Sequence, residues 1–240
     1  MKVYPGVCVN PGLAFGRVYI YDERHIETYG YVSSGDEWMV LEKAVLECSN
    51  QLDELIRSTC MRYGQTISTI FQAHKLMLSD PAILAMAKEL IQSGMNAYAA
   101  YQKAARKMID QFESHPNEYL RNRVMDIKDA TDRVLYYLVK QRYDMSVAFD
   151  DSRIIFVKEM RPSMMCLLEK DAIKGLVSES GAYNQHAGII LRIKDIPTMI
   201  VPEIMGEVQN NDSVFVDGNR SVIYLNPDEK LINNLLKERR

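Results

Sequence analysis

Residues 36–55 read DEWMVLEKAVLECSNQLDEL, and in this stretch the spacing of apolar residues changes the expected secondary structure. Apolar side chains recur there every three or four positions, which predicts one face of a long amphipathic helix. They are Trp38, Leu41, Val45, Cys48, Leu52 and Leu55. Residues 7–10 and 16–22 have a different pattern, because they are rich in β-branched and aromatic residues and are separated by the turn residues Pro11 and Gly12. We therefore predict two short strands followed by helix.

The helical pattern continues to about residue 138 and is interrupted by short turns. Residues 67–78 and 120–138 carry apolar stripes like that of the first helix. Between them, Asp80 can cap a helix that opens at Pro81, and Asn96 can cap another. Roughly 110 residues of consecutive helix with short connections predict a helical bundle.

After about residue 145 the pattern returns to short strands that alternate with helices. Helices are expected over residues 163–170 and 186–194, and Asp217-Gly218-Asn219 marks a hairpin turn. The expected strands are residues 153–157, 175–178, 198–201, 214–216 and 222–225. Because the N-terminal strands are too few to form a sheet alone, we expect them to join this part. The predicted fold class is an α/β domain, residues 1–32 and 146–240, interrupted by an inserted all-α helical bundle domain, residues 33–145.

Composition and charge argue against several classes of protein. Of the 240 residues, 47% are hydrophobic and 25% charged, as is ordinary for a soluble globular protein. A formal net charge of −3, without a cluster of Lys and Arg, argues against binding to nucleic acid. No apolar run approaches the ~20 residues that a membrane span needs, so no membrane segment is expected. The four cysteines form no C-x-x-C pair, which argues against a disulfide framework or a zinc site and favours a reducing cytoplasm.

Residues 181–192, GAYNQHAGIILR, place a histidine where a glycine leads from a strand into a helix. Glycine lets the backbone turn tightly, and the first turn of a helix presents unpaired N–H groups that suit a phosphate. His186 can accept a phosphoryl group on a ring nitrogen, because a neutral imidazole has a lone pair with which to attack. Arg192 is a candidate charge partner for that group. From these residues alone, a helix-capping or surface histidine is the alternative.

Four segments resemble the N-terminal half of enzyme I of the bacterial sugar phosphotransferase system, the phosphoenolpyruvate-protein phosphotransferase. They are VNPGLAFGRVYIYD (9–22), IFQAHKLMLSD (70–80), NEYLRNRVMDIKDATDRVL (117–135) and SVFVDGNRSVIYLNPDE (213–229). They follow the family's order over almost the whole chain. The resemblance implies a swivelling phosphohistidine domain interrupted by a helical domain that docks the histidine-containing phosphocarrier protein.

The resemblance also implies roles for single residues near the loop. His186 falls on the family's phosphohistidine, Ala182 replaces the second of two glycines, and Gln185 replaces a small hydroxyl residue. Arg161 replaces the Thr of a Thr-Pro-Ser turn whose Thr helps to position the active histidine. An arginine there can bind phosphate directly, or pair with a neighbouring carboxylate and block the site. The residues expected to bind or support the phosphate are Gly181, Gln185, Arg161 and Arg192.

In the helical domain the resemblance assigns two residues to docking of the carrier protein. Arg123 matches an arginine that the family uses for docking, and a solvated surface arginine is the alternative. His74 lies on the family's docking helix. Because it also falls within the apolar stripe of residues 67–78, a buried, hydrogen-bonded histidine is the alternative.

The family's second half is a barrel that binds phosphoenolpyruvate and magnesium, and a barrel needs ~250 residues beyond these. We therefore expect no cofactor and no metal in this chain, no phosphorylation by phosphoenolpyruvate without the barrel, and a monomer. The predicted function is phosphoryl transfer through a phosphohistidine to the histidine-containing phosphocarrier protein. The altered loop favours, as an alternative, a catalytically inactive binding or regulatory module. A piece cut from a longer protein is a third interpretation.

Overall fold

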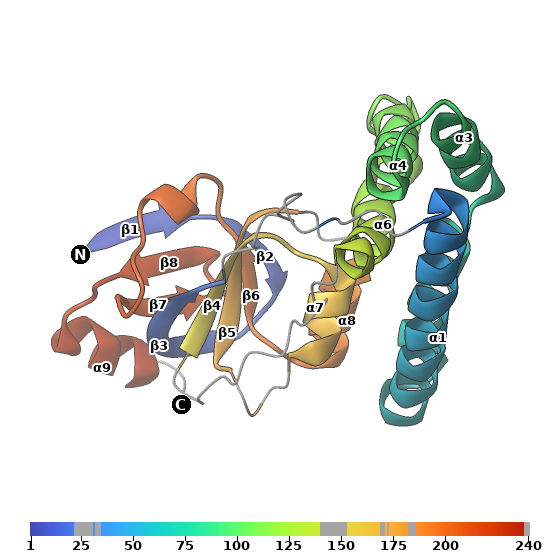
Figure 1. Cartoon of the computed structure of the whole chain (residues 1–240). Helices are drawn as coiled ribbons and strands as arrows, with labels where there is room; N and C mark the ends of the chain where they lie inside the picture. The colour runs from blue at the N-terminus through green and yellow to red at the C-terminus, as the bar shows by residue number, and fades with distance from the viewer. Residues whose placement is uncertain are drawn as a thin grey trace. The chain divides into compact units, whose positions relative to one another are not determined.

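The computed structural model describes residues 1–21, 31, 35–139, 153–168, 171, 173–181 and 186–237. The chain divides into two compact units (Figure 1). Residues 1–24 and 146–240 form the α/β unit, and residues 25–145 form the helical unit.

The α/β unit is built on one mixed sheet of eight strands in the order β1-β8-β7-β3-β4-β5-β6-β2 (Figure 1). The four strands from β3 to β6 pair in parallel, whereas β1, β8, β7 and β2 extend the two sides of this centre by antiparallel pairing. The strands are β1 Lys2–Pro5, β2 Val7–Asn10, β3 Leu13–Ile20, β4 Arg153–Glu159, β5 Gly175–Ser180, β6 Thr198–Ile200, β7 Ser213–Asp217 and β8 Val222–Leu225.

Strand β3 joins the two distant parts of the sequence into one sheet. It pairs with β4 on one side, where Val18 lies opposite Ile154, and with β7 on the other, where Gly16 lies opposite Val214. Val18, Ile154 and Val214 are fully buried in one apolar cluster. Since both segments bury side chains in the same core, neither can form this layer without the other.

Two helices connect the parallel strands of the α/β unit. Helix α7, Pro162–Leu167, lies between β4 and β5 in the chain, and α8, His186–Ile193, lies between β5 and β6. The two helices pack against each other, and α8 also contacts β2. A short 3-10 helix η2, Ile204–Gly206, contacts β4 and β5, and α9, Glu229–Lys237, follows β8.

The described part of the helical unit is a series of consecutive helices, as the sequence predicts. They are α1 Glu37–Tyr63, α2 Gln65–Leu78, α3 Pro81–Gln92, α4 Ala97–Glu113, α5 Glu118–Arg121 and α6 Val124–Leu138. Side chains of Asp80 and Asn96 accept hydrogen bonds from the first turns of α3 and α4, which confirms both predicted caps. Fully buried Tyr101 of α4 donates its hydroxyl to the Leu78 carbonyl at 2.8 Å, so α4 is tied to the end of α2.

The break between α5 and α6 and the presence of strand β1 both differ from the sequence prediction. The single helix expected over residues 120–138 is two helices, because Asn117 caps the first turn of α5 and the chain makes a tight turn at residues 122–123 before α6. Strand β1 was not predicted. It has four residues, includes Pro5, and pairs only with β8 at the edge of the sheet, where a proline is tolerated.

Burial predicts different reactivities for the cysteines. Cys48 is buried in the helical unit, and desolvation raises the pKa of its thiol to about 12, so little thiolate is available there. Cys166 is also buried, whereas Cys60 is exposed. In the native protein at pH 8, we expect a disulfide reagent to label Cys60 rapidly and to label Cys48 and Cys166 only after urea is added. Rapid native labelling of Cys48, measured by peptide mass spectrometry, would contradict this packing.

Candidate functional site

The loop that follows β5 places His186 at the start of α8. Strand β5 ends at Ser180, and Gly181 has φ 141°, a backbone conformation that side chains other than glycine rarely adopt. Helix α8 begins at His186, which is partly exposed. The structure thus has the strand, glycine and helix that the sequence predicts around the histidine. Ala182 and Gln185 lie outside the described residues.

Arg161 precedes α7 at the same edge of the sheet as Gly181. Strands β4 and β5 are parallel neighbours, and Glu159 lies opposite Ser180 in their register. Arg161 is the residue before α7, its backbone is extended, and Pro162 opens the helix. Because the carboxyl ends of parallel strands meet at one edge, Arg161 and the loop before His186 start from adjacent positions, which is where ligands bind in many α/β proteins.

Arg192 lies in the last turn of α8 and is partly exposed. It follows His186 by six residues, which corresponds to about 9 Å along a helix axis and to a different face of the helix. The buried face of α8 is formed instead by Ala187, Gly188, Ile190 and Leu191. Helix geometry therefore does not by itself bring Arg192 beside the His186 ring.

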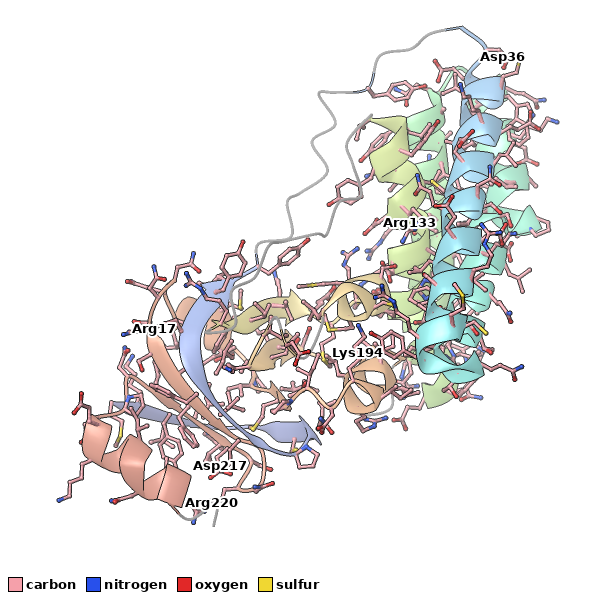
Figure 2. The ribbon with its side chains drawn as sticks, turned by 90° about the horizontal axis from the view of Figure 1, so that it is seen from below. Arg17, Asp36, Arg133, Lys194, Asp217 and Arg220 are labelled. Atoms are coloured by element: carbon pink, nitrogen blue, oxygen red, sulfur yellow. The ribbon has the colours of Figure 1, made fainter. Side chains whose placement is uncertain are left out.

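Lys194 connects the ends of α7 and α8, a role that no sequence signal indicated. Lys194 is labelled in Figure 2. Its side chain is 6% exposed, and Nζ donates hydrogen bonds to the carbonyls of Cys166 and Leu168, each at 2.5 Å. These carbonyls lie at the C-terminal end of α7, where a positive charge is favourable. The contact fixes α8, and with it the start of the helix at His186, relative to α7.

Hydroxyl groups order the ends of β4 and β5 before the loop. Ser180 Oγ donates to the Lys158 carbonyl at 2.9 Å, and Ser178 Oγ donates to the Ser180 carbonyl at 2.6 Å. Glu179 Oε1 accepts a hydrogen bond from the Met205 amide at 3.3 Å. Strand β5, which leads to Gly181, is thus hydrogen-bonded by side chains to β4 and to η2.

His74 is buried in the helical unit. It is 1% exposed, and its Nε2 lies 3.4 Å from Asp126 Oδ1 while its Nδ1 lies 3.8 Å from Asp129 Oδ2. The ring also makes an edge contact with Phe71. This geometry corresponds to the buried alternative, because a side chain at this depth cannot itself contact a docked protein.

Arg123, in contrast, reaches the surface of the helical unit. Its side chain is 22% exposed, and Nη1 lies 3.4 Å from Asp126 Oδ2. Nη2 donates to the Tyr119 hydroxyl at 2.6 Å, and the guanidinium lies 4.4 Å from the centre of the Tyr119 ring. Arg123 is therefore held between a buried carboxylate and an exposed aromatic ring.

A partly exposed apolar surface adjoins the residue that follows Arg123. Met77 of α2 and Met108 and Phe112 of α4 pack over a buried cluster of Ile109, Val124 and Ile127. We call these three partly buried residues the Met-Phe patch. Adaptable methionines beside an aromatic ring are suited to contact with another protein.

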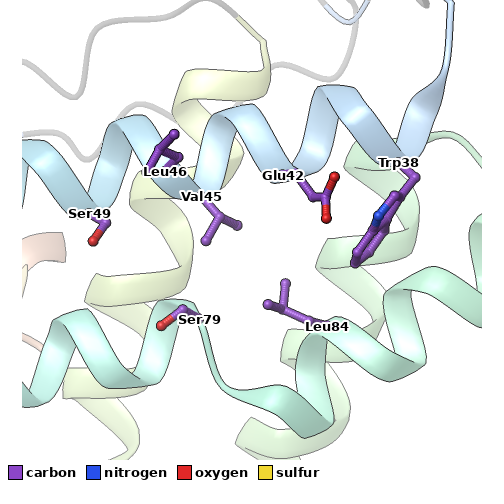
Figure 3. A pocket seen from close by; sticks show the side chains of 7 residues that line it. All are labelled: Trp38, Glu42, Val45, Leu46, Ser49, Ser79 and Leu84. Carbon is purple, nitrogen blue, oxygen red and sulfur yellow. The ribbon is translucent and has the colours of Figure 1, made fainter.

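A separate pocket of about 360 Å³ lies between α1, the end of α2 and α3 (Figure 3). It is lined by Trp38, Glu42, Val45, Leu46, Ser49, Ser79 and Leu84. One carboxylate among apolar and hydroxyl side chains offers neither a nucleophile paired with a base nor a cradle for phosphate. The pocket is therefore a weaker candidate for chemistry than the start of α8.

Within the described ranges, no group of three His, Cys, Asp or Glu side chains is placed to hold a metal ion. Nor does any helix in that part of the chain combine the length and apolar character needed to cross a membrane.

Comparison with known proteins defines the class. Residues 5–123 match the family model "PEP-utilising enzyme, N-terminal", and residues 149–221, which include His186, match "PEP-utilising enzyme, mobile domain". The two matches together span most of the sequence, and the chain belongs to the PEP-utilising enzymes.

Within that family the chain is similar to phosphoenolpyruvate-protein phosphotransferases. It is 28% identical over 235 residues to the protein of Geobacillus stearothermophilus, covering 96% of this chain and 41% of that protein. It is 27% identical over 236 residues to the protein of Bacillus subtilis (strain 168), covering 97% of this chain and 41% of that protein. The chain thus spans about two fifths of the length of these curated relatives, in keeping with the predicted resemblance to the N-terminal half of enzyme I.

Solved structures with the same fold include an NMR solution structure of Enzyme I (nEIt), with a TM-score of 0.73 and 22% identity, covering 98% of this chain and 97% of that one. The N-terminal domain of Enzyme 1 – Nitrogen has a TM-score of 0.58 at 22% identity, with 98% of each chain covered. The predicted fold class, an α/β swivelling domain interrupted by a helical bundle, is confirmed.

Proposed function

We propose that this chain carries a phosphoryl group on His186 and exchanges it with a histidine-containing phosphocarrier protein. The observation that carries the proposal is the position of His186: it opens α8 directly after the loop from β5, inside the segment that matches the mobile domain of PEP-utilising enzymes. A histidine at a helix start combines a nucleophilic nitrogen with backbone N–H groups that favour negative charge.

The transfer proceeds from one ring nitrogen to another. The lone pair of a His186 ring nitrogen attacks phosphorus while the phosphorus–nitrogen bond of the carrier breaks on the opposite side, and the departing ring keeps that electron pair. The other nitrogen of the His186 ring releases its proton and the departing ring takes one up, so the protons balance as well. The group moves as phosphoryl, so no oxidant, reductant or water is consumed. Catalysis consists of alignment and charge stabilisation, because such transition states carry their charge on the three equatorial oxygens.

The residues around His186 have distinct proposed roles. The N–H groups of the first turn of α8 and of Gly181 cradle the phosphoryl oxygens, and Gln185 is assigned a supporting role. Arg161 approaches from the neighbouring strand end, where its fork of donors suits phosphate oxygens. Arg192, at the other end of α8, contributes positive charge at longer range.

Docking of the carrier is assigned to the helical unit. Arg123 offers a charged group, and the next residue, Val124, lies in the cluster under the Met-Phe patch. Arginine and apolar surface are both common at protein interfaces. Phosphoenolpyruvate and magnesium belong, in this proposal, to a barrel domain outside these 240 residues. The chain itself is a monomer without a cofactor.

The proposal is tested by reverse transfer from the carrier. A panel of phosphocarrier proteins, phosphorylated beforehand on histidine, is mixed with the chain, and acid-labile phosphate on the chain is measured by intact mass. The expected result is one phosphoryl group per chain from at least one carrier, in the absence of phosphoenolpyruvate. If no carrier transfers phosphate, phosphoryl transfer through His186 is wrong.

The second candidate function is a catalytically inactive binding or regulatory module. The replacements at Ala182, Gln185 and Arg161 favour it, because each changes a position that in the family supports the active histidine. Calorimetric titration of the same panel separates the two functions. Carrier binding without phosphate transfer, unaffected by His186→Ala, would support the module, and gain of transfer on Gln185→Ser with Arg161→Thr would identify what was lost.

A further inference from the structure

Buried Asp126 lies between the interior and the surface of the helical unit. Its side chain is 2% exposed, and its two oxygens face different partners: Oδ1 lies 3.4 Å from His74 Nε2, and Oδ2 lies 3.4 Å from Arg123 Nη1. His74, on α2, is 1% exposed, whereas Arg123, at the start of α6, is 22% exposed. A continuous polar contact therefore runs from the core to a surface arginine.

The depth of Asp126 makes its partners energetically important. A carboxylate removed from water is stable only when it is paired and hydrogen-bonded, so His74 and Arg123 together fix where the Asp126 oxygens lie. Arg123 is held from the outer side as well, by the hydroxyl and the ring of Tyr119. Contacts from two sides hold the guanidinium plane in one orientation.

A preorganised arginine is more effective in an interface than a mobile one. Ordering a long side chain on binding costs conformational entropy, and an arginine that is already ordered avoids that cost. Its planar donors also require a defined direction to meet a partner's acceptors. Arg123 directly precedes Val124, which belongs to the buried cluster under the Met-Phe patch, so an oriented guanidinium can act together with that apolar surface.

We propose that Asp126 is a positioning residue for docking: it holds Arg123 ready for the partner protein, and His74 holds Asp126 from the interior. This inference rests on the proposed docking function of the helical unit. His74 thereby affects docking without touching the partner.

Asp129 supplies a matched control. It lies one turn after Asp126 on α6, is 0% exposed, and faces the other ring nitrogen of His74. Asp126→Asn and Asp129→Asn each remove one buried charge beside His74, but Asp129→Asn leaves the Asp126 carboxylate opposite Arg123. A merely structural role predicts similar effects of the two variants.

The first test is titration of a histidine-containing phosphocarrier protein into the full chain. Asp126→Asn is expected to weaken binding by about 3- to 10-fold, the equivalent of ordering one long side chain, and Asp129→Asn by less than about 2-fold. Asp126→Asn added to Arg123→Ala should weaken binding no further than Arg123→Ala alone. Equal effects of the two asparagine variants, or additive effects with Arg123→Ala, would overturn the proposal.

The second test needs no partner protein. In the free chain, NMR of arginine side chains should show restricted motion of the Arg123 guanidinium, compared with exposed Arg57, and loss of that restriction in Asp126→Asn but not in Asp129→Asn. If Asp126→Asn does not fold, the motion of Arg123 and Arg57 is compared in the wild-type chain alone. An Arg123 side chain as mobile as that of Arg57 overturns the proposal. If Arg123 is restricted but the chain binds no carrier, Asp126 still positions Arg123, and the proposed docking function is wrong.

Discussion

Replacing His186 by alanine is expected to abolish phosphoryl acceptance while the chain stays folded and still binds the carrier. The side chain is partly exposed at the first position of α8, and alanine is the best helix former, so the helix has no reason to unfold. What the variant loses is the imidazole nitrogen that, in the proposed mechanism, forms the bond to phosphorus. The measurement is acid-labile phosphate on the chain after incubation with a phosphorylated carrier.

His115→Ala is the matched control for that experiment. His115 is also partly exposed, and its Nδ1 accepts a hydrogen bond from the Asn117 amide near the start of α5. It stands in no segment that resembles a phosphorylation loop. The control should accept phosphate like the wild type, whereas persistent phosphorylation of His186→Ala would remove His186 from the mechanism.

The second large effect is expected for Lys194→Met, which keeps the length of the side chain and removes its three donors. The carbonyls of Cys166 and Leu168 then lose a charged hydrogen-bond partner in a buried place. An unsatisfied buried polar group costs about 1–3 kcal/mol, so we expect α8 to open more readily by about 2 kcal/mol or more. Roughly 30-fold faster hydrogen exchange of the α8 amides would report that change.

Phosphoryl acceptance should also slow in Lys194→Met, because His186 begins the helix that Lys194 fixes. Lys158→Met, at an exposed position of β4, serves as the control and should change neither exchange nor acceptance. Unchanged exchange in α8 of Lys194→Met would show that the lysine does not hold the two helices together.

The sequence predicted most of the fold because local signals and burial agreed. The stripe of residues 36–55 became α1, with Leu41, Val45, Cys48 and Leu52 buried, and two capping side chains marked the starts of α3 and α4. The missed strand β1 lacks such agreement, because a short edge strand with a proline has little pattern to detect. The break between α5 and α6 was missed because the apolar stripe continues through it.

In the candidate site, too, features set by neighbouring residues could be predicted and contacts between distant residues could not. A strand, a glycine and a helix around His186 are encoded by neighbouring residues, so their order could be predicted. The pairing of Asp126 with His74, and of Lys194 with α7, joins residues that are 52 and 26 to 28 positions apart. A local sequence pattern cannot predict contacts between residues so far apart.

The most direct test of the account is to locate the phosphoryl group on the wild-type chain after transfer from a phosphorylated carrier. NMR of 15N-histidine-labelled protein distinguishes the four histidines, His25, His74, His115 and His186, and detects phosphorus bound to a ring nitrogen. The account predicts one phosphoryl group per chain, on a nitrogen of His186. No phosphorylation by any carrier, or phosphorylation of another histidine, would contradict it.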